Sequence, residues 1–407
     1  MESVKEQLDL IALDTEEVLP PAELKQKLEK AVSKNKPLNI KFGVDPTAPD
    51  LHLGHAVPLK KLKELQDLGH VVTLIIGDFT ARIGDPSGRK ATRPQLTSKE
   101  IEKNAKTYTD QAFKILDKGK TKVAFNSQWL AKMDFTDVLN LAGNFTIARL
   151  LERDDFSKRY KEGLPIGLHE FLYPVMQAID SVEIKADIEV GGTDQKFNML
   201  AGRELQEKLG QEAQVVITLP ILEGVDGVQK MSKSLGNHIG LTEAPEEIFG
   251  KIMSIPDALL IKYFKLASTM SPSEIEKIEK ELKKGELNPA QAKRDLARSI
   301  IEIYYSQKEA RSAQDHFDRV FKEQKAPDKI PTVDIEKKEL KDSRVWPVKL
   351  FKLAGLVESH GEGRRLIEQK GAYINDKAIT DIEKNVSVKS GDVLRAGRRK
   401  FVRLRIK

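Results

Sequence analysis

Residues 37–77 read as a strand, a helix and a second strand in close succession, and this order constrains the fold more than any other feature. Pro37–Val44 is an apolar run typical of a buried strand. Ala56–Leu68 repeats apolar residues at helical spacing and is followed by Gly69, a common helix stop. Val71–Gly77 is almost entirely β-branched and leucine, as in a strand covered on both faces. Such a unit predicts an α/β fold with a parallel sheet.

The rest of the first half extends this pattern. Ile184–Gly191 and Gln214–Pro220 are predicted as two further strands, and residues 98–160 are predicted to be mainly helical. We therefore expect residues 1–240 to form one domain built on this sheet, with a helical insertion.

The second half changes character after Gly240. Residues 241–325 carry amphipathic helical patterns, clearest in Pro272–Lys284 and Pro289–Tyr305, and predict a separate α-helical domain. Residues 326–344 are charged, contain proline and lack a sustained period, which indicates a linker. Residues 345–407 are predicted as a small ordered module with helices near Val348–Ala354 and Gly361–Lys370, and strands at 372–374 and 393–404.

Charge is distributed unevenly along the chain. The last 63 residues hold 15 Lys+Arg and 7 Asp+Glu. The net positive charge of this segment is therefore larger than the net charge of the whole chain, which is +6. A small basic module on a near-neutral body favours a polyanionic partner, most often nucleic acid, over a merely solvated basic tail.

Composition excludes several classes of protein. The chain has no cysteine, which rules out disulfide scaffolds, thiol catalysis, iron–sulfur clusters and cysteine-ligated zinc. Its longest apolar runs are too short to cross a bilayer. The first residues lack a basic segment followed by an apolar run, so we expect no secretory signal and a cytoplasmic location.

Two histidines flank a glycine between the first predicted strand and its helix. His52 and His55 lie on one face of the helix start, where backbone N–H groups and the helix dipole favour an anion. Gly54 between them lets a nucleotide approach the backbone. No HExxH carboxylate accompanies the pair, so a zinc site is disfavoured. Alone, two such histidines are more often surface or capping residues.

A second motif, KMSKSLG, begins at Lys230 in a glycine-flanked stretch. Its two lysines, Lys230 and Lys233, suit a mobile clamp over a triphosphate, where ammonium groups offset the charge that grows on the leaving pyrophosphate. Alone it would be an ordinary surface loop. No GxxxxGK[ST] motif is present, which argues against P-loop chemistry.

Together, the two motifs resemble the signatures of class I aminoacyl-tRNA synthetases. Four further segments narrow the resemblance to bacterial tyrosyl-tRNA synthetases: GVDPTA from Gly43, IGDPSG from Ile83, YPVMQAID from Tyr173 and GGTDQ from Gly191. The resemblance runs over nearly the whole chain in the same order. It implies a Rossmann-like catalytic domain, an α-helical domain and a C-terminal α+β module similar to S4 RNA-binding domains.

The resemblance implies a two-step reaction. The tyrosine carboxylate attacks the α-phosphate of ATP, giving tyrosyl-adenylate and pyrophosphate, and the tyrosyl group then passes to the 3′-terminal ribose of tRNA(Tyr). Mg²⁺ is expected to arrive with ATP, held mostly by phosphates, and no protein metal ligand or tightly bound cofactor is expected. The family also implies a homodimer.

Roles carry over residue by residue. The catalytic residues implied are His52, His55, Lys230 and Lys233. The ATP contacts implied are Asp45, Thr47, Gly54, Asp194, Met231 and Ser232. The tyrosine contacts implied are Asp85, Tyr173, Gln177, Asp180 and Gln195, with Asp180 accepting the phenol hydrogen bond and Asp85 facing the α-ammonium. The spacing of Tyr173, Gln177 and Asp180 places all three along one helix face.

The basic module supplies the predicted tRNA contacts. They are Arg364, Arg365, Arg398, Arg399 and Lys400, which would track RNA phosphates.

The sequence departs from the family pattern at two positions. Lys41 stands where many members carry a tyrosine that also contacts the phenol, and Pro58 replaces a residue that touches the ribose in some members.

Three rival functions remain open at this point. An adenylyl-transferring enzyme that makes a cofactor would lack the helical and S4-like parts. A tryptophan-specific relative would lack the phenol-directed Asp180. A non-catalytic RNA-binding protein would normally have lost one signature.

Overall fold

The computed structural model describes residues 2–46, 50–85, 97–321, 330–341, 343–375, 377–397 and 400–407. The predicted site residues Thr47, Arg398 and Arg399 lie outside these ranges. The chain divides into two compact units, Met1–Ala244 with Lys251–Tyr305, and Pro245–Gly250 with Ser306–Lys407. Among the described residues, none of the helices combines the length and the apolarity that a membrane crossing needs.

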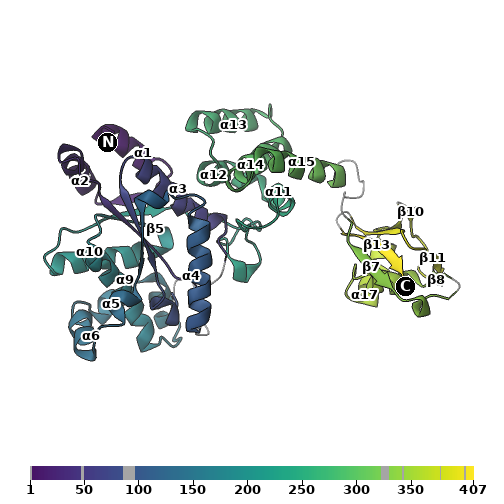
Figure 1. Cartoon of the computed structure of the whole chain (residues 1–407), viewed down its shortest axis with the longest axis horizontal. Helices are drawn as coiled ribbons and strands as arrows, with labels where there is room; N and C mark the ends of the chain where they lie inside the picture. The colour runs from purple at the N-terminus through teal and green to yellow at the C-terminus, as the bar shows by residue number, and fades with distance from the viewer. Residues whose placement is uncertain are drawn as a thin grey trace. The chain divides into compact units, whose positions relative to one another are not determined.

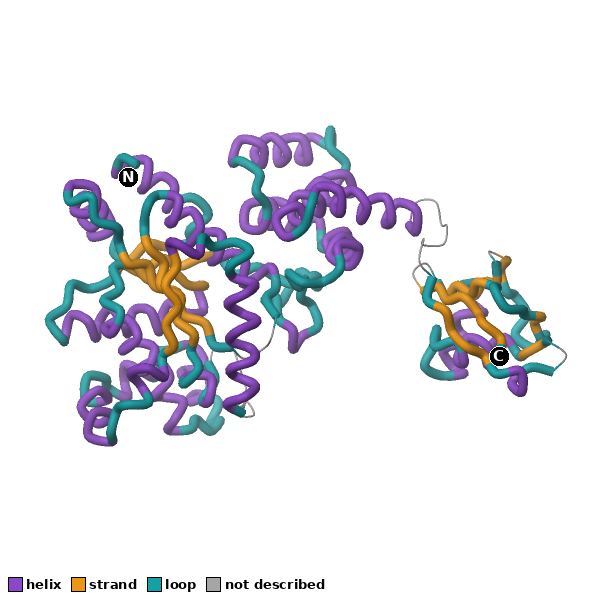
Figure 2. The backbone as a smooth tube through the Cα atoms, viewed as in Figure 1, coloured by secondary structure: helices purple, strands orange, loops and turns teal. Residues whose placement is uncertain are grey.

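The first unit is built on a six-stranded sheet, drawn in orange within its surrounding helices in Figure 2. Its strands are β1 (Glu17–Leu19), β2 (Asn39–Val44), β3 (Val71–Ile76), β4 (Thr121–Phe125), β5 (Ile188–Gly192) and β6 (Val215–Leu219). Its helices up to β6, labelled in part in Figure 1, are α1 (Val4–Ala12), α2 (Pro21–Ser33), α3 (Leu53–Asp67), α4 (Ser98–Ala112), α5 (Ser127–Leu130), α6 (Phe135–Ala142), α7 (Ile147–Leu150), α8 (Asp154–Lys161), α9 (Leu168–Glu183) and α10 (Lys196–Lys208). Short 3₁₀ turns are η1 (Thr80–Arg82), η2 (Lys118–Lys120), η3 (Thr193–Gln195) and η4 (Lys233–Leu235).

The predicted strand–helix–strand unit is confirmed. β2 pairs in parallel with β3, and α3 connects them. The apolar face of α3 is buried, with Leu59, Leu62 and Leu65 fully covered, because the helix packs on β3 and β5. All residues of β6 are buried, in line with a strand covered on both faces.

Strand order decides where a ligand can bind. The order is β1-β6-β5-β2-β3-β4, with β1 antiparallel to β6 and all other pairs parallel. The chain therefore runs outward from β2 to β3 and β4, and on the other side from β5 to β6. Ligands of such sheets bind at this reversal, beyond the carboxyl ends of the strands. Here that point lies after β2 and β5.

Two strands of the sheet lie outside the sequence-based expectation. β4 falls in a stretch predicted to be mainly helical, which corrects that prediction, and β1 has no predicted counterpart. Both lie at the edges of the sheet; β1 has only three residues, and β4 exposes two of its five. An edge strand with exposed residues gives little continuous apolar pattern for the sequence to reveal.

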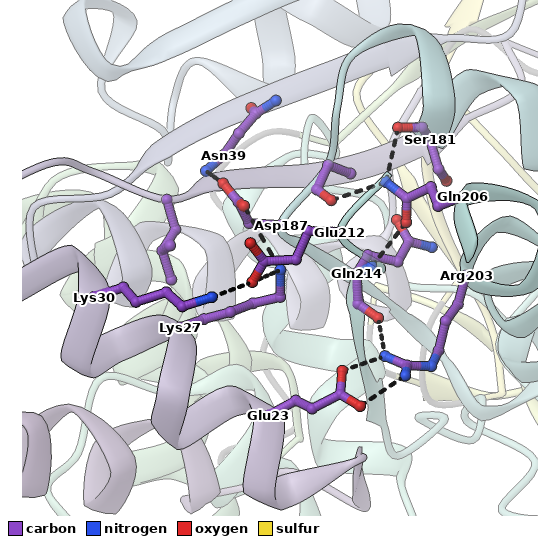
Figure 3. A network of polar contacts seen from close by, with 12 residues as sticks. Glu23, Lys27, Lys30, Asn39, Ser181, Asp187, Arg203, Gln206, Glu212 and Gln214 are labelled. Atoms are coloured by element: carbon purple, nitrogen blue, oxygen red, sulfur yellow. Dashed lines mark hydrogen bonds and ion pairs between the residues drawn. The ribbon is translucent and has the colours of Figure 1, made fainter. Parts of the chain in front are cut away.

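A polar network ties α2 to the β5–α10 part of the sheet (Figure 3). Both terminal nitrogens of the Arg203 guanidinium donate to the Glu23 carboxylate at 2.8 Å. The buried Lys27 ammonium lies 3.3 Å from Glu212 and 3.8 Å from Asp187. This network fixes the end of the sheet away from the predicted site, because Asp187 precedes β5.

The remaining helices of the first unit follow β6. They are η5 (Asp257–Leu259), α12 (Leu260–Ala267), α13 (Pro272–Lys284) and α14 (Pro289–Tyr304), preceded by α11 (Pro245–Ser254), which the two units share. The bounds of α13 match the prediction. Ser271 caps this helix through Glu274, and Gly285 ends it in the left-handed conformation.

The second unit holds α15 (Gln307–Phe321) and a small α+β module. The module contains β7 (Thr332–Ile335), η6 (Lys337–Glu339), β8 (Arg344–Val345), α16 (Pro347–Leu353), α17 (His360–Glu368), β9 (Ala372–Ile374), β10 (Lys377–Ala378), β11 (Val386–Ser387), β12 (Val393–Ala396) and β13 (Lys400–Ile406). Its strands form a five-stranded sheet in the order β10-β9-β12-β13-β7 and a β11–β8 pair. Its own apolar core includes Phe351, Leu394 and Leu404.

The predicted linker contains part of this module. β7 and η6 lie within 326–344, and β7 pairs in parallel with β13. The charged, proline-containing sequence concealed β7 because it is an edge strand with only Ile335 fully buried.

Candidate active site

Three side chains form one hydrogen-bonded group at the carboxyl ends of β2 and β3. Thr80 Oγ1 donates to Asp45 Oδ1 at 2.7 Å, and the Tyr173 hydroxyl donates to Asp45 Oδ2 at 3.0 Å. A Cβ at Gly77 would lie 2.1 Å from Asp45 Oδ1 and 2.3 Å from Thr80 Oγ1, so a larger residue there would displace this hydrogen bond. The structure thus joins a predicted ATP contact, Asp45, to a predicted tyrosine contact, Tyr173.

The histidine motif begins α3, and its backbone is hydrogen-bonded to the segment that follows the KMSKS motif. Leu53 N donates to Ile239 O and Leu241 N donates to Leu51 O, both at 2.9 Å. A Cβ on Gly54 would lie 3.1 Å from the His52 ring and 3.5 Å from Met231 Cβ. The two signatures, far apart in sequence, therefore lie side by side.

Both histidines of this motif are neutral at physiological pH. Burial, with the nearby His55, His238 and lysine charges, lowers the pKa of His52 to about 2. Burial and the two KMSKS lysines lower the pKa of His55 to about 4. The ring centroids lie 3.8 Å apart, and His52 N donates to His55 Nδ1, which leaves the His55 proton on Nε2. Each ring is therefore a neutral hydrogen-bonding group.

Each of the two signature lysines pairs with a carboxylate of the first unit. Lys230 Nζ lies 3.0 Å from Asp194 Oδ2 in η3, and Lys233 Nζ lies 3.0 Å from Asp50 Oδ2. Asp194 follows β5 and Asp50 precedes His52. The loop thus extends over the sheet edge where the strand order reverses, and it brings the positive charge that the neutral histidines do not supply.

Asn237 holds the KMSKS loop in shape. Its Oδ1 accepts from Ser232 N at 2.8 Å, and its Nδ2 donates to Asp226 Oδ2 at 2.8 Å and to Lys230 O at 3.2 Å. Met231 is buried, and its N donates to Leu222 O at 3.0 Å. Sequence reasoning missed Asn237, which stands just beyond the motif.

Asp85, predicted to face the substrate ammonium, already has a cationic neighbour. Arg153 Nη2 donates to its Oδ1 at 2.8 Å, and Gln195 Nε2 donates to its Oδ2 at 2.7 Å. Arg153 also pairs with Asp155 at 2.8 Å and is almost wholly buried. The structure therefore brings Asp85 and Gln195 together and adds Arg153, which no local motif signalled.

Asp180 lies fully buried among hydrogen-bond donors from the region after β4. Trp129 Nε1 donates to its Oδ1 at 2.8 Å, and Asn126 Nδ2 approaches its Oδ2 at 3.4 Å. Burial raises the pKa of Asp180 to about 7, against the effect of Lys41 and the two donors. A carboxylate so placed can accept a further hydrogen bond from a hydroxyl, and its raised pKa marks it as a functional-site candidate.

Lys41, which stands where many family members carry a tyrosine, is paired inside the protein. Its side chain is fully buried, and its ammonium lies 2.8 Å from Glu189 Oε1 on β5. It also donates to Gln177 O at 2.9 Å, beneath the α9 turn that carries two predicted tyrosine contacts.

α4 borders the site on the side of the histidines. Tyr108 packs edge-on against His55, with ring centroids 5.8 Å apart, and burial raises its pKa. Asn104 Nδ2 donates to Pro46 O at 3.0 Å, and Gln111 Oε1 accepts from Leu51 N at 2.7 Å. These contacts shape the segment between β2 and α3.

The predicted RNA contacts that the structure describes fall on the surface of the second unit. Arg364 and Arg365 are exposed on α17, with the Arg364 guanidinium 5.4 Å from the Trp346 ring centroid. Lys400 opens β13 and donates to Leu356 O at 3.3 Å.

Neither unit shows a metal site among the residues that the structure describes. Within those ranges, no three carboxylate or imidazole side chains converge in a way that would hold a metal ion.

Comparison with known proteins fits this geometry. The family model of class I tRNA synthetases (W and Y) matches residues 33–322. The tyrosine--tRNA ligase of Carboxydothermus hydrogenoformans is 50% identical over 99% of this chain and 98% of its own length. That of Thermotoga maritima is 50% identical over 98% and 97% of the two chains. A crystal structure of tyrosyl-tRNA synthetase complexed with L-tyrosine, from Archaeoglobus fulgidus, aligns with a TM-score of 0.63 at 28% identity, covering 76% of this chain and 99% of that one.

The rival functions are thereby set aside, and ATP is a substrate, as throughout this family. The chain belongs to the tyrosine--tRNA ligases, class I aminoacyl-tRNA synthetases that activate tyrosine and charge tRNA.

Proposed function

We propose that tyrosine activation takes place at the carboxyl edge of β2 and β5, with each predicted residue in a defined role. His52 and His55 donate hydrogen bonds to the ATP phosphates as neutral imidazoles. Lys230 and Lys233 leave their carboxylate partners and close over the pyrophosphate. Positioning and charge stabilisation carry the reaction, since little covalent chemistry is asked of the protein.

The substrates would lie on either side of the histidine motif. Asp194 would bind the ribose hydroxyls, and the remaining ATP contacts would come from Asp45, Thr47, Gly54, Met231 and Ser232. The tyrosine ammonium would be held by Asp85, Tyr173 and Gln177, and its carboxylate by Gln195.

Asp180 would accept the phenol hydrogen bond and so select tyrosine over phenylalanine. Phenylalanine has no hydroxyl to donate to this buried carboxylate, so the hydrogen bond gained with tyrosine would be missing at a site closed to water. Tyrosyl-tRNA synthetases are themselves the standard example of such discrimination, which reaches about 10⁵.

The observation that carries this proposal is the reach of the two lysines. Lys233 ends 3.0 Å from Asp50, two residues before His52, and Lys230 ends 3.0 Å from Asp194 after β5. Both lysines influence the two histidines, although the lysines stand roughly 175 residues further along the chain. Mg²⁺ would accompany ATP through the phosphates, and we assign it no protein ligand.

The test is the substitution Lys233→Ala. We expect the rate of tyrosyl-adenylate formation to fall by on the order of 10²-fold or more, because a charge that acts on the transition state is lost, while tyrosine binding changes little. Pre-steady-state adenylate formation measures the first and equilibrium binding the second.

Lys293→Ala is the matched control, since Lys293 also pairs with an aspartate, Asp257, but on the helices that follow β6. A Lys233→Ala enzyme with normal adenylation would refute the clamp.

We also propose that the protein is a homodimer. Of the large apolar residues that the structure describes as exposed, seven fall in 123–168, on and between β4, α6, α7, α8 and α9: Val123, Phe135, Leu139, Ile147, Tyr160, Leu164 and Leu168. So dense a group of exposed apolar side chains favours burial against a second copy. Sedimentation equilibrium that returned the mass of a single chain would contradict this.

The C-terminal module is proposed to bind tRNA(Tyr) through Arg364, Arg365, Arg398, Arg399 and Lys400. Its excess of basic residues and the exposure of the two α17 arginines support this role. Residues 1–240 would then form the catalytic domain, 241–325 an α-helical domain, and the C-terminal module predicted at 345–407, with β7 added, the RNA-binding domain of a protein that works in the cytoplasm with its tRNA.

A further inference from the structure

A buried ion pair lies directly beneath the α9 turn of the tyrosine site. Lys41 of β2 and Glu189 of β5 are both almost completely buried, and their charged atoms are 2.8 Å apart. Lys41 Nζ also donates to Ser181 Oγ at 2.7 Å and to Gln177 O at 2.9 Å. Three acceptors on two elements thus satisfy the ammonium.

The carboxylate of the pair is held equally well. Glu189 Oε2 accepts from Ser181 Oγ at 3.2 Å and from Gln214 Nε2. α10 leaves room for these side chains, since a Cβ at Gly202 would lie 2.6 Å from Ser181 Oγ and 2.9 Å from Gln214 Nε2. The network therefore joins β2, β5, α9 and the residue before β6, with α10 packed closely against it, and Figure 3 shows two of its members, Ser181 and Gln214.

The contacts of Lys41 fall on either side of Asp180. Gln177 stands three residues before Asp180 and Ser181 directly follows it, so both anchors belong to the turn of α9 that carries the proposed phenol acceptor. A shift of this turn would move Asp180 and the Gln177 side chain together. Lys41 is also the position at which many family members carry a tyrosine.

We propose that Lys41 is a positioning residue for tyrosine recognition, which fixes the 177–181 turn through its contacts with Glu189, Ser181 and Gln177 O and so holds Asp180 in place as the acceptor for the phenol. This inference rests on the proposed role of Asp180 and deepens it. The Lys41 ammonium is satisfied by Glu189, Ser181 and the Gln177 carbonyl, so it would act on the substrate through this turn of α9.

The electrostatics of the pocket agree with this geometry. Among the charged neighbours of Asp180, Lys41 on β2 lowers its pKa and Glu189 on β5 raises it, while Trp129 and Asn126 donate hydrogen bonds from the region after β4. Burial outweighs these effects and leaves the pKa of Asp180 at about 7. Removing Lys41 would therefore favour the protonated acid, and removing the charge of Glu189 would favour the carboxylate.

The test compares Lys41→Met and Glu189→Gln in tyrosine-dependent and phenylalanine-dependent pyrophosphate exchange across pH 5–9. For Lys41→Met we expect the preference for tyrosine over phenylalanine to fall on the order of 10-fold or more, through kcat/KM for tyrosine. The acid limb of the pH profile of this kcat/KM should move to higher pH by about 1 pH unit. For Glu189→Gln the limb should move to lower pH. A purely structural role would not shift the two variants in opposite directions.

Two further variants serve as controls for folding. Lys61→Met is the matched control, because Lys61 is also buried and its ammonium donates to Leu13 O at 2.6 Å and lies 2.7 Å from Glu64, away from the pocket. It should lower stability without changing selectivity. If Lys41→Met does not fold, the double variant Lys41→Met/Glu189→Gln takes its place. It removes both charges of the pair, so we expect it to fold and to show reduced selectivity.

Asp180→Asn separates this inference from the role on which it rests. Unchanged selectivity in Asp180→Asn would refute the phenol acceptor itself. Two outcomes would overturn the role of Lys41 alone. In the first, Asp180→Asn loses selectivity while Lys41→Met keeps a normal tyrosine/phenylalanine preference and a normal acid limb of its pH profile. In the second, the acid limbs of Lys41→Met and Glu189→Gln move in the same direction.

Discussion

His70 links the stability of the catalytic unit to pH through a single buried ring. Its Nδ1 accepts from Leu38 N at 3.2 Å, so its proton sits on Nε2, 2.9 Å from Gln7 Oε1. This joins α1 to the start of β2. Burial lowers the pKa of His70 from 6.5 to about 4.

The sign of the pH effect follows from this pKa. Between pH 6.5 and about 4 the unfolded chain binds a proton at His70 and the folded chain does not, so unfolding is favoured as the pH falls. The loss is complete near pH 4 and amounts to on the order of 3 kcal/mol. Above pH 6.5 the residue contributes no slope.

We expect His70→Gln to be less stable than the wild type at pH 8, where the native hydrogen bonds are lost without any gain in charge. As the pH falls toward 4.5, this difference in free energy of unfolding should shrink by on the order of 1–3 kcal/mol. Urea unfolding at a series of pH values measures it. His52 and His55 have lowered pKa values in both proteins and cancel in the difference. A difference that stayed constant with pH would show that His70 binds its proton equally in the folded and unfolded chains, and would contradict the prediction.

Among the structural elements, the KMSKS loop has a backbone frame, held by Asn237, that carries two ion-paired lysines. Asn237 binds the backbone of Ser232 and Lys230, whereas both lysines end on carboxylates at the surface of the site. Gly236, in the left-handed conformation, closes η4 just before it. The frame sets the position of the backbone from which the two lysines reach their carboxylates.

Asn237→Ala should therefore slow adenylate formation by on the order of 10- to 100-fold while the KM for tyrosine changes little, since a small displacement of a catalytic group is costly. Single-turnover kinetics measures the rate. Gly224→Ala should act in the same direction, because its Cβ would lie 2.3 Å from Asn237 Cγ. Asn288→Ala, which removes the cap of α14, is the control for lost stability alone. Equal rates in Asn237→Ala and Asn288→Ala would contradict the frame.

Across the whole chain, the catalytic part and the basic module have separate hydrophobic cores. The C-terminal module buries its own set of apolar residues, and the sheet of the first unit has another. The excess of positive charge lies in the module. Adenylate formation and tRNA charging should therefore be separable by truncation.

A chain ending at Phe321 should retain tyrosine-dependent pyrophosphate exchange and lose most of its tRNA charging. Truncation there removes β7 with β13, so no strand is left without its partner. The salt dependence of tRNA binding should become shallower, because phosphate contacts are lost. Charging that matched the full chain at every salt concentration would exclude the module from tRNA binding.

Particular residues show how far sequence reasoning reaches. The bounds of α13 and β9 match their predictions because each is set by a local signal, a capping serine and terminal glycine for α13 and a short apolar run for β9. The family pattern assigns Asp85 and Gln195 to one substrate, and the structure joins them. By contrast, Arg153, Trp129 and Asn126 lie in a part of the chain with no recognisable motif, and only their contacts with Asp85 and Asp180 reveal them.

The α/β architecture, the family, the activity and the two signatures can all be deduced from consecutive residues, because periodicity, caps and motifs are local. Which charges meet depends instead on the folded chain. Lys41 lies beneath α9 against Glu189, Lys230 and Lys233 end on Asp194 and Asp50, and the histidines are neutral. Charge pairing and pKa depend on distance and burial between residues far apart in the chain, and those are fixed only when the strands and helices pack together.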